Sequence, residues 1–365
     1  MPSWLPPLGM LLRCAAVLAV VAIVGGFLTI WSGFYSVAAS RGHWPGFELV
    51  LEFAMRSSVR THALLIQVPQ IDRPEQARRG AGHFQQACAP CHGSPAGPSM
   101  LVARSMLPPP SDLKDLVPTW KTRELFWIVK NGLKYTGMPT WPTQQRDDEV
   151  WDTVAFLREL PAMSRERYRE LAGFAATDEA PSRTPDEARL ASCARCHGDD
   201  GRGRDTTAFP RLDIQTAPYL LDQLKAYANG TRASGFMQAA TAELSAREMA
   251  WLAEHYAKAR PAAAAPPLEA DSLRRQGEAL FRSGAPEQGV PACAACHGAK
   301  AADRDLRYPA LLGQYASHTK TQLELFKQGA RNTTEAAPLM TTIAQRMTDE
   351  QVRAVAAYLA AEPAR

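Results

Sequence analysis

The sequence predicts an all-α protein in which an N-terminal transmembrane helix precedes three helical domains of one design. Residues 14–40 carry no charged side chain, which indicates the membrane helix. A six-residue motif, Cys-x-x-Cys-His-Gly, occurs three times at domain-sized spacing. Each copy is followed by an amphipathic stretch with helical periodicity, and no run alternates polar and apolar residues as strands do.

Composition sets the outer limits of this prediction. The chain has 365 residues, which suits two or three domains, and 46% hydrophobic residues, which suffice for packed cores. Its net charge of +4 arises from 41 basic and 37 acidic residues scattered along the chain. No long basic run marks a nucleic-acid-binding face. We therefore expect no nucleic acid among the partners.

Residues 1–44 are predicted to form a membrane anchor. The stretch from Cys14 to Trp31 is strongly apolar, and about 20 apolar residues are needed for a helix to cross the hydrocarbon core. Trp31 and Tyr35 lie where an aromatic interface belt would fall. A cleaved signal peptide is the alternative, with a passable cleavage site at residues 36–38.

Residues 45–72 are predicted to contain a juxtamembrane amphipathic helix. Glu48, Glu52, Arg56 and Arg60 fall four apart on one stripe, with the acidic residues first. That order suits side-chain pairing along a helix and the helix dipole. Most other positions are apolar, so we expect the helix to lie at the membrane surface or to pack on a partner.

The motif occurs as CAPCHG at residue 88, CARCHG at residue 193 and CAACHG at residue 293, which places the copies 105 and 100 residues apart. Self-similarity at this spacing predicts one domain for each copy. The expected domains are residues 73–163, 176–262 and 268–365. The expected linkers are residues 161–187, which are charged and turn-rich toward their end, and residues 260–268, which are proline-rich.

The second and third domains match further at a constant offset of 99 residues. FPRLDIQTAPYLLDQLKAYANGTR (209–232) aligns with YPALLGQYASHTKTQLELFKQGAR (308–331), with identical Pro, Leu, Gln, Gly and Arg positions. This similarity predicts a duplicated pair that packs as one unit. The first domain, a more distant relative, is expected to be attached only through the 161–187 linker.

Each domain also has a methionine in a common register with its last helix. Apolar residues follow 12 and 19 positions after Met138, Met237 and Met340. Acidic or hydroxyl side chains that signal a helix start follow eight or nine positions after each of these methionines. Met347 is a competitor of Met340, but its equivalents are Gln145 and Leu244, which indicates a packing position.

Cys-x-x-Cys-His is the attachment signature of a c-type haem. Both thiols add to the haem vinyl groups, and the adjacent histidine can then turn only onto the iron. A zinc site would need a second ligand pair at a suitable distance, which no domain has. A redox dithiol does not require the histidine. We therefore expect three covalently bound haem c groups, with zinc and redox sites as the alternatives. The residues expected to form thioethers are Cys88, Cys91, Cys193, Cys196, Cys293 and Cys296.

The iron of such a haem needs two axial ligands. The histidines of the motifs, His92, His197 and His297, are expected on one side, and Met138, Met237 and Met340 on the other. Core filling by methionine is the alternative reading of the second set. A ligating histidine usually donates its other ring nitrogen to an acceptor. The carbonyls of Pro210 and Pro309 are candidates, with Pro110 as the counterpart in the first domain.

Each domain therefore resembles a class I cytochrome c, with CxxCHG near a first helix, a methionine loop and a C-terminal helix. Residues 188–362 resemble the tandem dihaem cytochromes c of bacterial periplasms. The first domain resembles the single-haem domains of membrane-bound respiratory cytochromes. The second domain departs from the pattern because it lacks the counterpart of Gly80 and Phe84, so its first helix is expected to be short.

The resemblance implies an electron-transfer protein with no catalytic residues of its own, because His and Met on every iron leave no free site for a substrate. It also implies a location at the bacterial inner membrane, with a single-pass anchor and the haem domains in the periplasm. The expected role is a relay in a respiratory chain, from a quinol-oxidising complex to a haem–copper terminal oxidase. The alternative is the cytochrome subunit of a periplasmic dehydrogenase that passes electrons to quinone.

Overall fold

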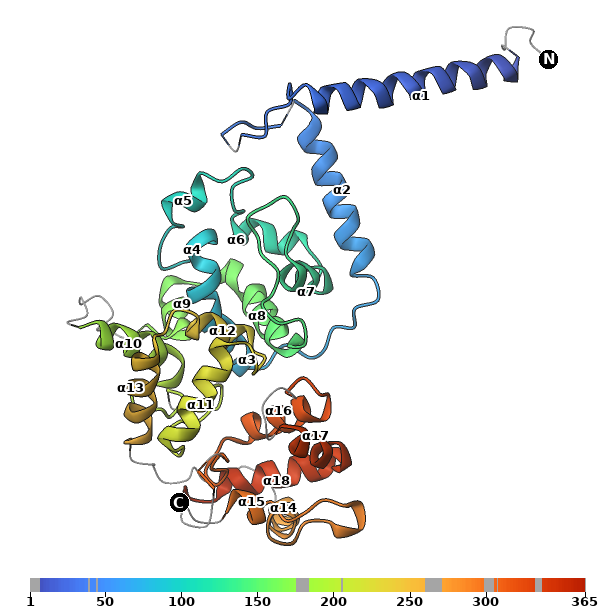
Figure 1. The fold of residues 1–365 in the computed structure, drawn as a ribbon. Helices are drawn as coiled ribbons and strands as arrows, with labels where there is room; N and C mark the ends of the chain where they lie inside the picture. The colour runs from blue at the N-terminus through green and yellow to red at the C-terminus, as the bar shows by residue number, and fades with distance from the viewer. Residues whose placement is uncertain are drawn as a thin grey trace.

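The computed structural model describes residues 7–38, 40–43, 45–174, 184–204, 206–259, 271–298, 305–306, 308–331 and 337–364. Within these residues the regular structure is helical, apart from two isolated β-bridges, Ser94 with Gly97 and Ala285 with Val290. Figure 1 shows an extended helix followed by three helical domains. The all-α prediction is therefore confirmed. The expected linker at residues 260–268 lies outside the described residues.

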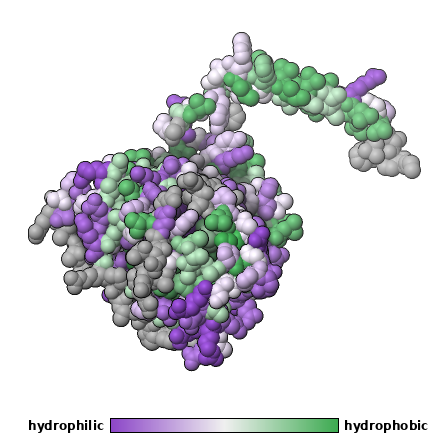
Figure 2. Space-filling view, turned by 60° about the horizontal axis from the view of Figure 1, so that its bottom comes forward, coloured by the Kyte–Doolittle hydropathy of each residue, from purple (hydrophilic) through white to green (hydrophobic). Residues whose placement is uncertain are grey.

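Helix α1 (Leu8–Trp31) has the length and composition of a membrane span. An 18-residue window within its 24 residues has a mean hydropathy of 2.4, and no residue of the helix is buried. At 1.5 Å per residue the helix is about 36 Å long, which exceeds the hydrocarbon thickness of about 30 Å. Figure 2 shows it as a hydrophobic rod that projects from the rest of the molecule.

Helix α2 (Phe47–His62) lies within residues 45–72, where an amphipathic helix was expected. The expected stripe is partly paired, since Arg56 Nε lies 2.8 Å from Glu52 Oε1. Val59, near the end of α2, belongs to the core of the first domain, whereas Phe53 is 73% exposed. The helix was expected at the membrane surface or packed on a partner. The structure shows that the C-terminal end of α2 packs against a domain of the same chain.

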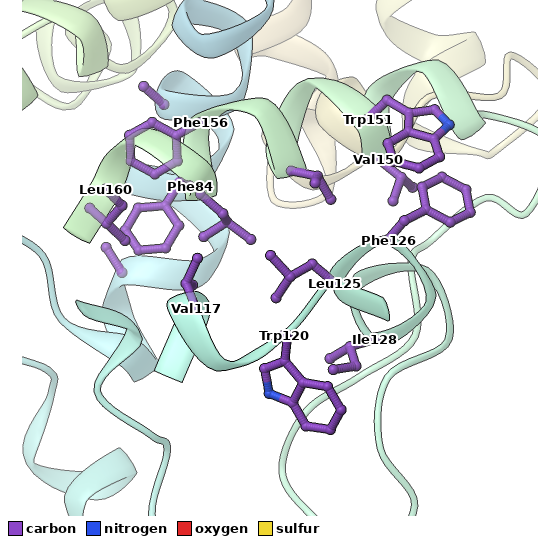
Figure 3. Packing of buried hydrophobic residues seen from close by; sticks show 14 of the residues in the cluster. Phe84, Val117, Trp120, Leu125, Phe126, Ile128, Val150, Trp151, Phe156 and Leu160 are labelled. Carbon is purple, nitrogen blue, oxygen red and sulfur yellow. The ribbon is translucent and has the colours of Figure 1, made fainter. Parts of the chain in front are cut away.

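The first domain is built around the crossing of its first and last long helices. Its elements are α3 (Pro74–His83), the π-helical turn η1 (Phe84–Cys88), α4 (Ala89–His92), α5 (Leu101–Arg104), α6 (Leu113–Leu116), η2 (Val117–Thr119), α7 (Thr122–Asn131), α8 (Asp147–Glu159), η3 (Leu160–Ala162) and α9 (Arg165–Ala172). Helix α3 packs against α8 so closely that a Cβ at Gly80 would overlap the carbonyl of Asp152. Figure 3 shows the core beside this crossing, where Phe84, Phe156 and Leu160 lie together.

Helix α9 overturns part of the linker prediction. It lies within residues 161–187 but packs on α3, and its Tyr168 and Leu171 are almost fully buried in the core of the first domain. The phenol of Tyr168 donates to Gln85 Oε1. The apolar face of α9 therefore belongs to the first domain, although its other positions are charged.

The second domain contains α10 (Pro185–His197), α11 (Ala217–Ala228), α12 (Gly235–Thr241) and α13 (Ala246–Ala257). The prediction of a short first helix was wrong, because α10 has 13 residues and runs without interruption through the cysteine motif. It has no buried residue. The second domain lacks the glycine that lets the first and last helices approach closely in the other domains. Helix α10 therefore packs more loosely against α13, although it is not shorter.

The third domain contains α14 (Asp271–Ser283), η5 (Pro286–Gln288), α15 (Ala294–His297), α16 (Ala316–Lys327), α17 (Ala337–Arg346) and α18 (Asp349–Ala361). Helices α14 and α18 repeat the crossing of α3 and α8. A Cβ at Gly277 would overlap the carbonyl of Ala354, which makes glycine necessary at this approach.

The second and third domains pack through a reciprocal pair of glutamines. Gln215 Nε2 donates to the carbonyl of Ala310 at 3.0 Å, and its Oε1 accepts from Ala310 N at 2.9 Å. Gln314 makes the same two bonds with the backbone of Arg211, each at 3.0 Å. Because 314 and 310 are 215 and 211 plus 99, the interface joins equivalent residues. The predicted pairing of the duplicated domains is confirmed.

The first domain also contacts the second directly, so the prediction that it is attached only through the linker was wrong. Arg146 Nη1 donates to the carbonyl of Ala233 at 2.8 Å, and Arg204 Nη2 donates to the carbonyl of Glu170 at 2.6 Å. Figure 1 shows α12 beside the first domain. Arg146, which is 9% exposed, therefore has an acceptor in the second domain, as a buried charged group requires.

Candidate haem-binding sites

The three cysteine motifs end three helices in the same way. Helices α4, α10 and α15 each finish at the histidine of the motif. The glycine that follows has a φ of 70° at Gly93, 75° at Gly198 and 59° at Gly298. This left-handed conformation favours glycine and turns the chain directly after the histidine. The final Gly of the motif is therefore explained by the backbone.

Burial raises the pKa of four of the six motif thiols. All six are free of disulfides. Burial raises the pKa of Cys88 and Cys196 to about 12, and that of Cys193 and Cys293 to about 11. Reactive and metal-binding cysteines have a lowered pKa instead. No group of three His, Cys, Asp or Glu side chains in the described part of the chain is placed to hold a metal ion. Haem attachment therefore remains the chemistry that the motifs themselves indicate.

Carbonyl groups orient the motif histidines. Nδ1 of His92 lies 3.0 Å from the carbonyl oxygen of Ser111, and Nδ1 of His297 lies 3.1 Å from that of Pro309. When Nδ1 donates to a carbonyl, Nε2 is left free to bind a metal. The Pro309 prediction is confirmed, whereas the acceptor in the first domain is Ser111 and not Pro110.

His197 is held less strictly. Burial lowers its pKa to about 4, and the Pro210 carbonyl opposes this shift. Among the described residues, however, its Nδ1 has no partner in standard hydrogen-bond geometry. The ring is therefore neutral and directed by Pro210, but the bond is longer or more bent than in the third domain.

A single cavity joins the sites of the second and third domains. Its volume is about 1140 Å³, which exceeds the range of about 300–1000 Å³ for a site that holds one small molecule. The cavity has room for more than one such group. Among the residues that line it are Cys193, Cys196, His197, Met237, Cys293, Cys296, His297 and Met340. The structure thus brings together every residue that was predicted for these two sites.

The first domain arranges its residues separately. The cavity does not include Cys91, His92 or Met138. Instead, Cys88 and Met138 pack against the same hydrophobic core of that domain. Gly132, with a φ of 65°, lets the end of α7 approach the methionine segment, since a Cβ there would lie 2.7 Å from the carbonyl oxygen of Met138.

The two methionines of the third domain have different surroundings. Met347 is 4% exposed and belongs to the hydrophobic core with Phe281, Val352 and Leu359. Met340 is half-buried, and both methionines line the cavity. Met347 is therefore a core residue, as predicted.

Two arginines, Arg232 and Arg331, line the cavity, although sequence reasoning gave them no role. Arg232 is 6% exposed and donates to Gln223 and Gln322, and Arg331 donates to Gln322 at 2.6 Å. Within the described residues neither has a carboxylate partner, and Nε of Arg331 has no hydrogen bond. Burial, with the nearby charge of Arg232, lowers the pKa of Arg331 to about 10. The sequence did contain a signal for this pair, because arginine occupies both equivalent positions of the duplicated domains, 99 residues apart.

This pair of arginines fits the group that the motifs imply. Buried guanidinium groups without an anion are costly, and they bind carboxylates in preference to other ligands. Each haem carries two carboxylate side chains, so the two haems implied for this cavity would offer each arginine an anionic partner. The donor set of the cavity, with thiols, neutral imidazoles, thioethers and arginines, therefore suits haem c better than a metal ion alone.

Comparison with known proteins agrees with this chemistry. The family model for subunit III of the cbb3-type cytochrome c oxidase matches residues 75–157 and 183–255, and the cytochrome c model matches residues 274–361. The thiosulfate dehydrogenase electron acceptor of Thiomonas intermedia is 39% identical over 173 residues, which are 47% of this chain and 79% of that protein. Cytochrome c4 of Pseudomonas aeruginosa is 31% identical over 174 residues, which are 47% of this chain and 85% of that protein.

Among solved structures, the reduced cytochrome c4 of Pseudomonas stutzeri is similar, with 28% identity and a TM-score of 0.44, over 50% of this chain and 100% of that chain. These relatives each account for about half of the present chain. The matches reach the motifs of all three domains. The chain therefore belongs to the class I c-type cytochromes and is an electron-transfer protein whose cytochrome c domains imply covalently bound haem c.

Proposed function

We propose that this protein is a membrane-anchored relay with three haem c groups that carries electrons from a quinol-oxidising complex to a haem–copper terminal oxidase. The anchor is α1, and the three domains lie on the periplasmic side of a bacterial inner membrane. The observation that carries the proposal is the continuous cavity of the second and third domains, because it is lined by both cysteine motifs and both methionines. The match of the first two domains to an oxidase subunit model supports electron flow toward an oxidase.

The haem groups would supply reversible one-electron reduction. The chain would hold them through thioethers at the six motif cysteines, with His92, His197 and His297 on one side of the irons. Met138, Met237 and Met340 would occupy the other side, and a methionine ligand raises the reduction potential. Arg232 and Arg331 would neutralise haem carboxylates.

A second candidate function is electron acceptor or cytochrome subunit of a periplasmic dehydrogenase that passes electrons on to quinone. It is favoured by the relatives described as thiosulfate dehydrogenase electron acceptors, at 39% and 36% identity. The two candidates share the haem sites and differ in the partners and in the direction of flow.

Redox titration of the full-length protein in membranes distinguishes the candidates. For the oxidase relay we expect three raised potentials, because each iron would carry a methionine. We also expect rapid oxidation of the reduced protein by a haem–copper oxidase. A haem with a potential at or below that of the quinone pool, together with quinone reduction by a purified complex, would instead establish the dehydrogenase role.

A further inference from the structure

The three domains share one register at the start of their last helix, but they use it differently. Eight residues after each candidate methionine ligand stands the residue that precedes the helix, and eleven residues after it stands the third residue of the helix. The first position is Arg146, Ser245 or Thr348, and the second is Glu149, Glu248 or Gln351.

In the second and third domains these two positions form a capping box. Ser245 N donates to Glu248 Oε2 at 2.8 Å, and Glu248 N donates to Ser245 Oγ at 3.2 Å. Thr348 and Gln351 make the equivalent pair at 2.9 and 3.1 Å. Each side chain therefore satisfies a backbone amide of its own helix.

In the first domain the position before the helix is Arg146, which has no acceptor atom to offer an amide. Glu149 turns away from its own helix and enters the second domain. Its carboxylate accepts from Ser234 Oγ at 2.5 Å and from Gly235 N at 2.6 Å. Glu149 is 3% exposed, and Arg146 Nη1 lies 2.8 Å from its Oε1.

These contacts are made with the segment that carries the methionine of the second domain. Gly235 is the first residue of α12, and Met237 is the third. Ser234 Oγ, which donates to Glu149, also accepts from Met237 N at 3.1 Å. One hydrogen-bonded chain thus runs from Glu149 through Ser234 to the backbone of Met237.

The first domain also packs against α12 with aromatic rings. Trp141 lies so close to Gly235 that any side chain there would overlap the indole. The ring of Phe236 stacks on His83 of α3 at a centroid distance of 4.7 Å. The first turn of α12 is therefore enclosed by residues of the first domain, which fix its direction.

We propose that Glu149 is a positioning residue for the second haem site, through which the first domain holds Met237 against its iron. The inference rests on the proposed ligation by Met237. It explains why a helix-capping position in two domains is used for a neighbouring domain in the other. It also makes the methionine bond of the second site dependent on the presence of the first domain.

The test compares Glu149→Ala and Glu149→Gln with Glu248→Ala, a matched change in the same register. The probe is NMR of the full-length reduced protein with labelled methionine methyl groups. The three iron-bound methyl signals are assigned with Met138→Ala, Met237→Ala and Met340→Ala. The methionine–iron charge-transfer absorption of the oxidised protein and thermal unfolding are measured on the same samples.

We expect Glu149→Ala to displace or weaken the Met237 methyl signal alone and to reduce the charge-transfer absorption by up to one third. Glu149→Gln keeps an acceptor for Ser234 or Gly235 and should restore most of both. Glu248→Ala should lower the unfolding temperature and leave the Met237 signal in place. A Met237 signal that is unchanged in Glu149→Ala, or equal shifts of all three signals, would refute the proposal. If Met237→Ala removes no signal, the proposed ligation itself fails, whatever Glu149 does.

Discussion

The two interfaces of this protein differ in how they use equivalent residues. Between the second and third domains, Gln215 and Gln314 stand at matching positions and bind matching backbone groups of the opposite domain. Between the first and second domains, Arg146 and Glu149 bind residues 233–235 at the start of α12, and these contacts join positions that are not equivalent in the two domains. The first interface is what duplication of one domain produces. The second shows that a capping position can be reused to attach a further domain.

We expect the largest effect from replacing a proposed methionine ligand. Each of the three domains should have one such ligand, although their interfaces differ. Met340→Ala should remove one third of the methionine–iron charge-transfer absorption. Met347→Ala should leave the absorption intact and lower the free energy of unfolding by about 2–5 kcal/mol, because it opens a cavity in the core. Absorption spectra and denaturant unfolding measure both quantities. Loss of absorption in Met347→Ala, with none in Met340→Ala, would reverse the assignment.

The symmetric interface predicts equal effects of equivalent substitutions. Gln215→Ala leaves the amide and carbonyl of Ala310 buried without partners, and Gln314→Ala does the same to Arg211. An unsatisfied buried polar group costs about 1–3 kcal/mol. Both variants should therefore lose stability by similar amounts in denaturant unfolding. Gln345→Ala, at an exposed position, serves as the control and should change little.

Unequal losses would contradict the symmetry of this interface. If only one glutamine mattered, the pairing would depend on another contact, such as the bond from Tyr315 Oη to the carbonyl of Arg202 at 2.8 Å. The variant Tyr315→Phe would then show the missing loss of stability.

Much of the fold and the sites was predictable from the sequence, because the same signals occur three times. The starts of the last helices at residues 147, 246 and 349 were correctly predicted from the repeated methionine register, and the core position of Met347 followed from its uncharged equivalents. The identity of Gln215 and Gln314 indicated a duplication. It did not indicate which backbone groups each side chain would bind. Their partners depend on how two domains dock, which no local pattern encodes.

Other features were hidden because local chemistry pointed elsewhere. The charged residues of α9 indicated a linker, although Tyr168 and Leu171 lie three apart on one helical face. Glu149 stands where a helix-capping acid is expected, and only the arginine before the helix hinted that no capping box forms. Its partner Ser234 is 85 residues away, so the contact could be found only in the folded chain.

The smallest effect we predict concerns pH, and it has opposite signs at equivalent positions. Burial raises the pKa of Glu149 to about 7, opposed by Arg146 and assisted by Asp148, which are the charged groups around it. The hydroxyl and amide of Ser245, with Arg189, lower the pKa of Glu248 to about 2. The ordinary value for both is 4.5.

The two pKa shifts determine how the free energy of unfolding changes with pH. Between about pH 4.5 and 7 the folded state holds the Glu149 proton more tightly than the unfolded state, so its contribution to stability should fall as pH rises. Between about pH 2 and 4.5 the folded state holds the Glu248 proton less tightly, so its contribution should be lost as pH falls. Unfolding of the wild type compared with Glu149→Gln and Glu248→Gln isolates each slope. If Glu149→Gln kept the pH dependence of the wild type, another titratable group would be responsible for it.

The central claim is that each of the three domains holds one covalently bound haem. The most direct measurement is the mass of the denatured full-length chain, produced with its haem-attachment machinery. We predict a mass that exceeds the polypeptide by three haem groups, one in each of three peptides that contain Cys88, Cys193 and Cys293. A mass with fewer than three haems, or haem that is extracted by acidic acetone, would contradict the claim.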